Sequence, residues 1–377
     1  MAGADPLLNG EPERFPIEVA STFYTGLNEP KPTSMNFSMD GLSFISSHND
    51  DALRLIDVAS MHHTETIQCE VFGIHAVRYT QSAHVLCVSP RLPLDGHLHL
   101  LNLETAQFVG EMAYLNDLDG EIHPYPNMPV YSTLSQCPAS DVLGAVVSAK
   151  GRLALFHPLV SGAIAASADK TVNGNKVALS FNHDGHHILL GDDRRITLLD
   201  RRFLFASPVL CLENKKLFSS RPELARCKGA EYGIDQSHLL LTSSLGEVVV
   251  YDWKSGRVVC NYYHDDAKRH FVGSEDAIGA KYVHPNLRDS MIAQPTSSMV
   301  GGRHLLVYGG YKNSADDEIP KEEGGVKADK QVEVQAGPLH YELQSKDSDV
   351  PIALEVNPRY NLVATAARSV TWWAFNE

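Results

Sequence analysis

One phrase occurs twice in this chain and constrains its fold more than any other feature. The first copy begins at residues 37–41 (Phe-Ser-Met-Asp-Gly) and ends at residues 53–57 (Leu-Arg-Leu-Ile-Asp). The second begins at residues 181–185 (Phe-Asn-His-Asp-Gly) and ends at residues 196–200 (Ile-Thr-Leu-Leu-Asp). Each copy predicts a strand, a tight Asp-Gly turn, a second strand, a polar loop and a third strand. This order is typical of a propeller blade, which cannot bury its apolar faces alone and must recur around a ring.

Weaker copies of the same order appear five more times, which brings the number of units to seven. They span residues 77–102, 131–156, 229–252, 280–308 and 352–373. Seven units in 377 residues allow about 54 residues each, against roughly 40 to 45 for a blade of the WD-repeat type. The sequence therefore predicts an all-β, seven-bladed WD-repeat β-propeller whose surplus residues lie in loops.

The two ends of the chain complement each other. Residues 15–23 read as a strand without partners of its own, and only residues 374–377 follow the last predicted strand. We expect residues near 15–25 to supply the outermost strand of the seventh blade, which closes the ring and leaves no open sheet edge. Residues 1–14 are predicted to be a flexible tail. Residues 15–377 then form a single propeller, with a charged loop insertion at about 313–335.

Composition excludes several classes of function. No stretch approaches the ~20 apolar residues that span a bilayer, which predicts a soluble protein. The formal net charge of −14 argues against direct binding of duplex DNA, which depends on neutralising phosphates. The six cysteines are scattered without a close pair, and this indicates a reducing compartment.

The residues expected on the innermost strands favour a role without catalysis. A propeller hydrolase would need three or four carboxylate or histidine ligands facing the central channel. The channel positions read instead as Asn36, Arg78, Thr133, Ser180, Glu231, Lys281 and Glu355. We therefore predict no catalytic residues, no metal site and no cofactor.

Two other motifs receive structural interpretations. His97 and His99 would lie on one face of a strand, but a third metal ligand is missing, and we interpret them as structural histidines. Trp372 and Trp373 are adjacent in a predicted strand, so their rings must face opposite sides of it. We expect them to pack between blades rather than to form a ligand cage.

One constellation suggests a binding surface. The loops that join the second and third strands of all blades emerge on one rim of a propeller, and five of these seven loops carry cations, where chance predicts roughly two. The cations are Arg91, Lys150, Arg152, Arg194, Arg195, Arg303 and Arg368. Guanidinium groups bind phosphates and carboxylates through paired hydrogen bonds. The hypothesis is that this basic rim captures an acidic or phosphorylated peptide, and that exchange of Arg152, Arg194 and Arg195 for Glu abolishes the capture.

Longer word matches indicate a family. They are residues 72–80 (Phe-Gly-Ile-His-Ala-Val-Arg-Tyr-Thr), residues 37–41 with 45–51, and residues 356–360 (Val-Asn-Pro-Arg-Tyr) with 364–367. With these words the chain resembles a divergent member of the small WD-repeat adaptor subunits shared by two assemblies. One is the COMPASS histone methyltransferase complex, and the other is the type-one protein phosphatase complex built on a PNUTS scaffold.

The resemblance implies a non-catalytic adaptor in the nucleus that links phosphatase or chromatin machinery to RNA polymerase II transcription and its termination. Expected partners are a PNUTS-like scaffold with type-one phosphatase, methyltransferase subunits, and the phosphorylated polymerase tail. Two alternatives stay open at this point. One is a WD-repeat substrate receptor of a ubiquitin ligase, because the same fold serves many assemblies. The other is a metal-dependent propeller hydrolase.

Overall fold

The structure is a computed structural model of the chain. It describes residues 17–23, 30–92, 96–113, 131–147, 151–167, 172, 177–204, 206–219, 222–233, 236–262, 279–283, 291–295, 303–308, 339–344, 353–367 and 369–375. The predicted tail at residues 1–14 and the predicted charged loop at residues 313–335 lie outside these residues.

The described strands form seven four-stranded antiparallel sheets, here numbered in chain order. In each of the first four sheets, the strands pair in the order in which they occur along the chain. They are β2 (Pro32–Phe37), β3 (Ser43–His48), β4 (Ala52–Asp57) and β5 (His62–Gln68); β6 (Ala76–Tyr79), β7 (Val85–Ser89), β8 (His97–Asn102) and β9 (Gln107–Ala113); β10 (Tyr131–Gln136), β11 (Leu143–Val147), β12 (Arg152–Phe156) and β13 (Ala163–Ala166); and β14 (Ala178–Phe181), β15 (His187–Gly191), β16 (Arg195–Asp200) and β17 (Leu210–Glu213).

The last three sheets keep the same plan, except that the seventh takes its outer strand from the other end of the chain. Their strands are β18 (Cys227–Tyr232), β19 (His238–Ser243), β20 (Val248–Asp252) and β21 (Arg257–Tyr262); β22 (Lys281–Val283), β23 (Met291–Pro295), β24 (Arg303–Tyr308) and β25 (Leu339–Gln344); and β26 (Ala353–Val356), β27 (Leu362–Ala366) and β28 (Val370–Phe375) with β1 (Ile17–Phe23). A short 3-10 helix, Arg201–Phe203, lies between β16 and β17 of the fourth sheet, and helix α1 (Asn214–Leu217) follows β17 on the way to the fifth sheet.

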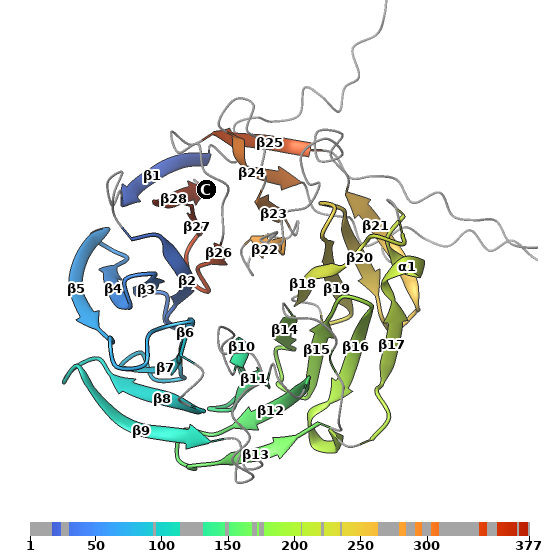
Figure 1. Ribbon diagram of the computed structural model, residues 1–377. Coiled ribbons are helices and arrows are strands. Elements are labelled where there is room, and N and C mark those ends of the chain that lie inside the picture. The colour runs from blue at the N-terminus through green and yellow to red at the C-terminus, as the bar shows by residue number, and fades with distance from the viewer. Residues whose placement is uncertain are drawn as a thin grey trace, which may run out of the picture.

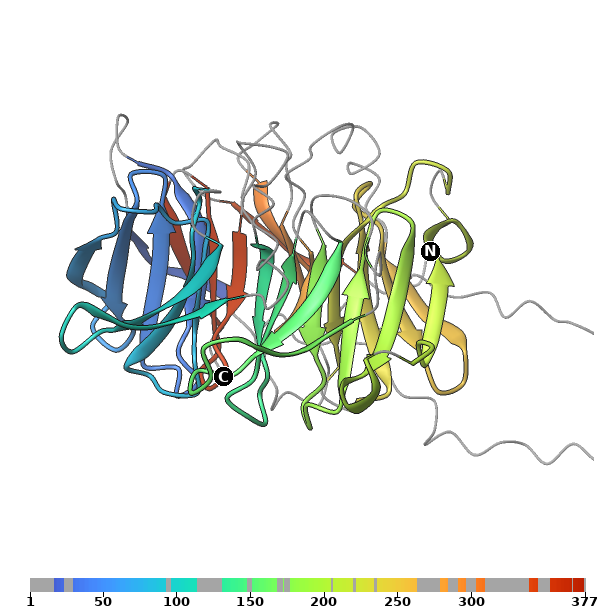
Figure 2. The same cartoon turned by 60° about the horizontal axis from the view of Figure 1, so that its bottom comes forward.

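The sheets stand around a central axis, with the first strand of each toward the middle and the fourth toward the outside (Figure 1). Figure 2 gives a second view of the same arrangement, in which the strands run between an upper and a lower rim. The predicted class, an all-β protein with a propeller arrangement, is confirmed. The sequence did not reveal strand β23, which is short and ends at Pro295.

The strand pattern follows from where each strand lies in its sheet. Middle strands are covered on both faces by neighbouring sheets, so they read as nearly continuous apolar runs, as in β11, where all five residues are buried. The outer strand β5 is polar and almost wholly exposed. The two Asp-Gly turns of the repeated phrase place Gly41 and Gly185 at φ +72° and +69°, a region that glycine enters without steric cost.

The N-terminal strand has the partner that the sequence predicted. β1 pairs antiparallel with β28, from Ile17 opposite Phe375 to Phe23 opposite Val370. The backbone groups along that side of β28 are thereby hydrogen-bonded, which leaves the seventh sheet with four strands like the others.

Apolar clusters fill the spaces between neighbouring sheets. Between the seventh and first sheets, the Trp372 ring meets Phe44 and Phe37 edge to face, with ring centroids 4.5 and 5.6 Å apart. Trp373 is also buried, and its indole Nε1 donates to Thr365 Oγ1 at 2.9 Å. Both tryptophans are core residues, and for Trp372 the predicted packing between sheets is confirmed. None of the helices in the described part of the chain has the length and apolar character of a membrane span.

Candidate functional site

The polar residues predicted for the central channel all lie on first strands of sheets and are half-buried. Residue by residue from the first sheet to the seventh, they are Asn36, Arg78, Thr133, Ser180, Glu231, Lys281 and Glu355. In most of these strands the next residue is a buried aromatic or aliphatic side chain, such as Tyr79 after Arg78, because successive side chains of a strand point to opposite faces. The sequence therefore placed these residues on the innermost strands correctly.

Some of these side chains hydrogen-bond to the first strand of the neighbouring sheet. The amide of Tyr79 donates to Asn36 Oδ1 at 2.8 Å, and Thr133 Oγ1 donates to the carbonyl of Val177 at 2.7 Å. First strands expose one backbone edge toward the channel, and these bonds satisfy groups on that edge. The channel side chains thus contribute to the contact between sheets.

Glu355 connects charges from three sheets. Its Oε2 lies 2.6 Å from Lys281 Nζ in the sixth sheet, and its Oε1 lies 3.4 Å from Arg78 Nη2 in the second. Arg78 Nη1 also donates to the carbonyl of Met35 at 2.8 Å. Because each charge has an opposite partner, these groups compensate one another instead of presenting one sign to a ligand.

Glu231 is the channel carboxyl with the most perturbed acidity. Burial raises the pKa of Glu231 to about 7, against the opposing effects of Lys281 and of the Tyr282 amide, which donates to Glu231 Oε2 at 3.1 Å. The nearby carboxylate of Glu355 raises the pKa further. Among the described residues, no group of three or more His, Cys, Asp or Glu side chains is placed to hold a metal ion.

The cations of the predicted basic rim are only partly described. Lys150 and Arg368 lie outside the described residues, and Arg303 is described only in its backbone. Three cations predicted in loops begin strands instead: Arg152 in β12, Arg195 in β16 and Arg303 in β24. The reason is that ladder pairing already begins at these residues, as in Arg152 opposite Val147 and Arg195 opposite Glu213.

Two of the described rim cations are bound to carboxylates. The Arg91 guanidinium forms an ion pair with Asp51 of the first sheet and donates to the carbonyl of Asn49 at 3.3 Å. Arg195 Nε lies 3.9 Å from Oδ2 of Asp192, which belongs to the same turn. The sequence identified where these cations lie but did not reveal their carboxylate partners.

Arg194 is the exposed cation of this rim in the fourth sheet. The amides of Arg194 and Arg195 both donate to Asp192 Oδ1, at 2.7 and 2.8 Å. These bonds fix the backbone of the turn and leave the Arg194 side chain toward solvent. Among the predicted cations whose side chains the structure describes, Arg194 and Arg195 share one turn.

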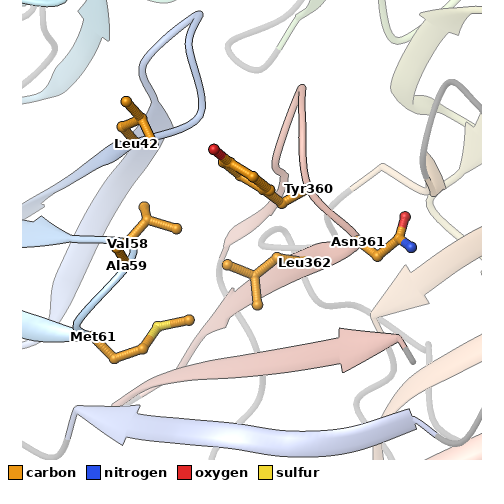
Figure 3. Close-up of a pocket in the computed structure, with 7 residues that line it drawn as sticks. All are labelled: Leu42, Val58, Ala59, Met61, Tyr360, Asn361 and Leu362. Carbon is orange, nitrogen blue, oxygen red and sulfur yellow. The ribbon is translucent and has the colours of Figure 1, made fainter. Parts of the chain in front are cut away.

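An open groove lies on the opposite rim, between the first and seventh sheets (Figure 3). It has a volume of about 300 Å³ and is lined by Leu42, Val58, Ala59, Met61, Tyr360, Asn361 and Leu362. These residues come from the β2–β3 turn, the β4–β5 turn and the β26–β27 turn. The basic rim consists instead of turns between second and third strands, which emerge at the other ends of the strands.

The groove combines a buried floor with exposed apolar edges. Val58 and Leu362 are 6% and 5% exposed, and they belong to the cluster around Phe44 and Trp372. Leu42 and Tyr360 on the edges are 45% and 47% exposed. An apolar concavity above a packed core is a typical site for an apolar side chain of a partner.

Hydrogen bonds fix the two walls of the groove to each other. The buried Asn357 amide donates from Nδ2 to the carbonyl of Gly41 at 2.8 Å, across 316 positions of sequence. Its Oδ1 accepts from the amides of Arg359 and Tyr360 at 2.8 and 2.9 Å. A Cβ at Gly41 would lie 2.4 Å from this Oδ1, so only glycine fits. The groove is therefore preformed.

Two ionised carboxylates, Asp40 and Asp57, stand beside wall residues of the first sheet in the sequence, although neither is among the residues that line the groove. Burial alone would raise the pKa of Asp40, but hydrogen bonds from Ser38 and the Leu42 amide lower it below its ordinary value. The side chain and amide of Ser60 lower the pKa of Asp57. Both groups therefore carry negative charge at neutral pH. Arg359 is exposed on the other wall, next to Tyr360.

Sequence reasoning did not find the groove. A signal was present, because Leu42, Val58 and Tyr360 are apolar residues in positions that the strand pattern assigns to turns, where polar residues predominate. The wall residues come from opposite ends of the chain, and only the folded sheets bring them together.

The histidine pair of the sequence analysis has a structural environment. His99 is buried and its ring stacks on Phe72, with centroids 4.0 Å apart and planes 7° from parallel. His97 lies two residues earlier, with its ring centroid 6.5 Å from that of His99. This aromatic contact agrees with the structural interpretation of His99.

Comparison with known protein families and with characterised proteins finds no match to this chain.

Proposed function

We propose that the chain is a non-catalytic adaptor, in which the seven sheets are the blades of one WD-repeat ring closed by β1 and the binding surface is the groove between the first and seventh sheets. The observation that carries the proposal is the groove itself. It is open, apolar and preformed, with Asn357 holding its walls. Preformed apolar concavities bind partners well because little ordering is needed on association.

The charges of the channel favour an adaptor over an enzyme that binds a ligand there. Glu355 is engaged by Lys281 and Arg78 at the same time. A ligand in the channel would have to displace these partners. A surface groove requires no such rearrangement.

We further propose that the adaptor serves in the nucleus, in a type-one phosphatase complex with a PNUTS-like scaffold or in a histone methyltransferase complex that acts on RNA polymerase II transcription and its termination. One word of the family resemblance, residues 356–360, contains Tyr360, which lines the groove. The other, residues 37–41, ends at Gly41, whose carbonyl accepts from Asn357 and so joins the two walls. The basic rim stays a predicted second contact, for an acidic or phosphorylated segment such as the polymerase tail.

Affinity purification of the tagged chain from its native cells, followed by mass spectrometry, tests the proposal. Phosphatase scaffold or methyltransferase subunits in the eluate would support it. A cullin adaptor would support a ubiquitin ligase receptor instead, and an eluate without stoichiometric partners would contradict an adaptor of any kind. Elemental analysis of the purified chain adds an independent check, because bound stoichiometric metal would favour the hydrolase.

A further inference from the structure

We infer that the groove between the first and seventh sheets receives a short linear segment of a partner protein, in which a large apolar side chain is flanked by Lys or Arg. This inference rests on the proposed adaptor function and specifies the chemistry of the partner. It is argued from the size of the groove and from the charge and acceptor capacity of two carboxylates in the turns that supply its first-sheet wall.

The size of the groove limits the occupant. A volume of about 300 Å³ is at the lower end of the range of about 300 to 1,000 Å³ for ligand sites. Figure 3 places Leu42, Met61 and Tyr360 around one concavity, with Leu362 at its base. This space suits one or two apolar side chains of an extended segment, whereas a broad interface between folded domains would bury a larger area.

The charge on the first-sheet wall selects the residues beside the anchor. Asp40 precedes Leu42 by two positions, and Asp57 immediately precedes Val58. In Asp40 the hydrogen bonds from Ser38 and Leu42 go to Oδ1, and in Asp57 both bonds from Ser60 go to Oδ2. Both carboxylates keep acceptor capacity at their remaining oxygens, and Asp40 also receives a hydrogen bond from its own backbone amide.

A Lys or Arg beside the apolar anchor would supply donors to these two oxygens. An acidic or phosphorylated segment would be repelled by them. A second copy of the chain is also disfavoured as the occupant, because each copy carries a formal net charge of −14.

Selection from a displayed random-peptide library against the immobilised full-length chain tests the inference. We expect the enriched peptides to share an aromatic or aliphatic residue next to Lys or Arg. Leu42→Asp and Tyr360→Ser should each weaken binding of the best peptide about tenfold or more. Asp40→Asn and Asp57→Asn keep the turn hydrogen bonds but remove the charge, so we expect losses of about two- to fivefold each.

Phe203→Ser is the matched control. Phe203 is 61% exposed and lies in the turn between β16 and β17, on the same rim but in the fourth sheet. Binding should be unchanged in this variant, and melting curves should show that all variants are folded. Enrichment of acidic peptides, no enrichment at all, or binding that survives Leu42→Asp would overturn the inference.

The same variants in affinity purification separate this inference from the proposed function. If the wild-type chain recovers partners and the Leu42→Asp chain recovers them equally well, the inference fails and the adaptor function stands. If the wild-type chain recovers none, the adaptor function itself fails.

Discussion

The two rims of this propeller differ in how their side chains are satisfied. On the basic rim, Arg91 and Arg195 face the carboxylates of Asp51 and Asp192. On the opposite rim, Leu42 and Tyr360 are half-exposed above a packed core, and the carboxylates of Asp40 and Asp57 have hydrogen bonds from their own turns but no ion pair in the described part of the chain. The difference teaches that a concentration of charge in the sequence does not identify a binding surface until the partners of each charge are known.

The largest expected effect concerns the floor of the groove. Trp372→Ala would remove a buried ring that packs on Phe37 and Phe44, and we expect it to lower the free energy of unfolding by about 3–5 kcal/mol. Denaturant titration measures this. Trp253→Ala is the control, because Trp253 is only partly buried and belongs to the fifth sheet. Equal losses of unfolding free energy in both variants would show that Trp372 under the groove contributes no more to stability than Trp253 does.

Acidification should weaken the basic rim before the groove. Burial lowers the pKa of His48 to about 4, outweighing the hydrogen bond with the Pro30 carbonyl. The folded pKa lies below the ordinary value of 6.5, so stability is fully present above pH 6.5 and is lost as pH falls toward 4. The loss is at most about 3 kcal/mol.

The comparison of the rims becomes measurable in this pH window. His48 precedes the loop that carries Asp51, whereas the pKa values of Asp40 and Asp57 are lowered and keep these groups charged. Peptide binding by the groove should therefore persist at pH 5 while the unfolding free energy declines. His48→Gln should flatten the decline, and an unchanged pH dependence in that variant would contradict the assignment to His48.

The preformed geometry of the groove can be tested at Gly41. Gly41→Ala brings a Cβ against Asn357 Oδ1, in addition to the strain of φ +72°. Gly256→Ala is a matched control, because Gly256 has φ +73° but its Cβ would meet only the Tyr251 hydroxyl at 3.8 Å. In both variants, backbone strain should lower the free energy of unfolding by about 1 kcal/mol. We expect Gly41→Ala to lower the free energy of unfolding by about 1–2 kcal/mol more than the control does, and to weaken peptide binding. Equal losses of stability in the two variants would show that Asn357 can move away from the added Cβ.

The smallest effect is expected on the basic rim. Arg91→Ala removes an ion pair whose arginine is 45% exposed, and such pairs contribute about 0–1 kcal/mol. Asp51→Ala should lower the free energy of unfolding by about 1 kcal/mol more than Arg91→Ala does, because Asp51 Oδ1 also accepts from the Ile74 amide at 3.0 Å. Thermal unfolding distinguishes the two variants. A larger loss of stability in Arg91→Ala than in Asp51→Ala would contradict this assignment and point to the hydrogen bond from Arg91 to the Asn49 carbonyl.

Much of the fold could be predicted because it depends on local patterns that repeat. The Asp-Gly turns, the apolar middle strands and the polar residues on first strands all follow from alternation along the chain, and Glu231, Lys281 and Glu355 were placed on first strands in this way. The partner of β1 followed from counting strands at the two ends. Strand β23 escaped notice because a short strand ending in proline carries little pattern.

The groove could not be predicted because it depends on contacts between distant residues. Asn357 and Gly41 meet across 316 positions, and no periodicity links the turn before β3 to the turn before β27. For the same reason the sequence could not reveal that Asp51 neutralises Arg91, forty positions away. Polar turn residues can be assigned to a rim from strand order, but their partners depend on how neighbouring sheets approach.

Affinity purification with two matched variants tests the central claim most directly. One variant combines Leu42→Asp with Tyr360→Ser in the groove, and the other replaces Arg152, Arg194 and Arg195 with Glu on the basic rim. The groove account predicts that partners are lost from the first variant and largely retained by the second. Retention by the groove variant together with loss from the rim variant would contradict the account and favour the hypothesis drawn from charge alone.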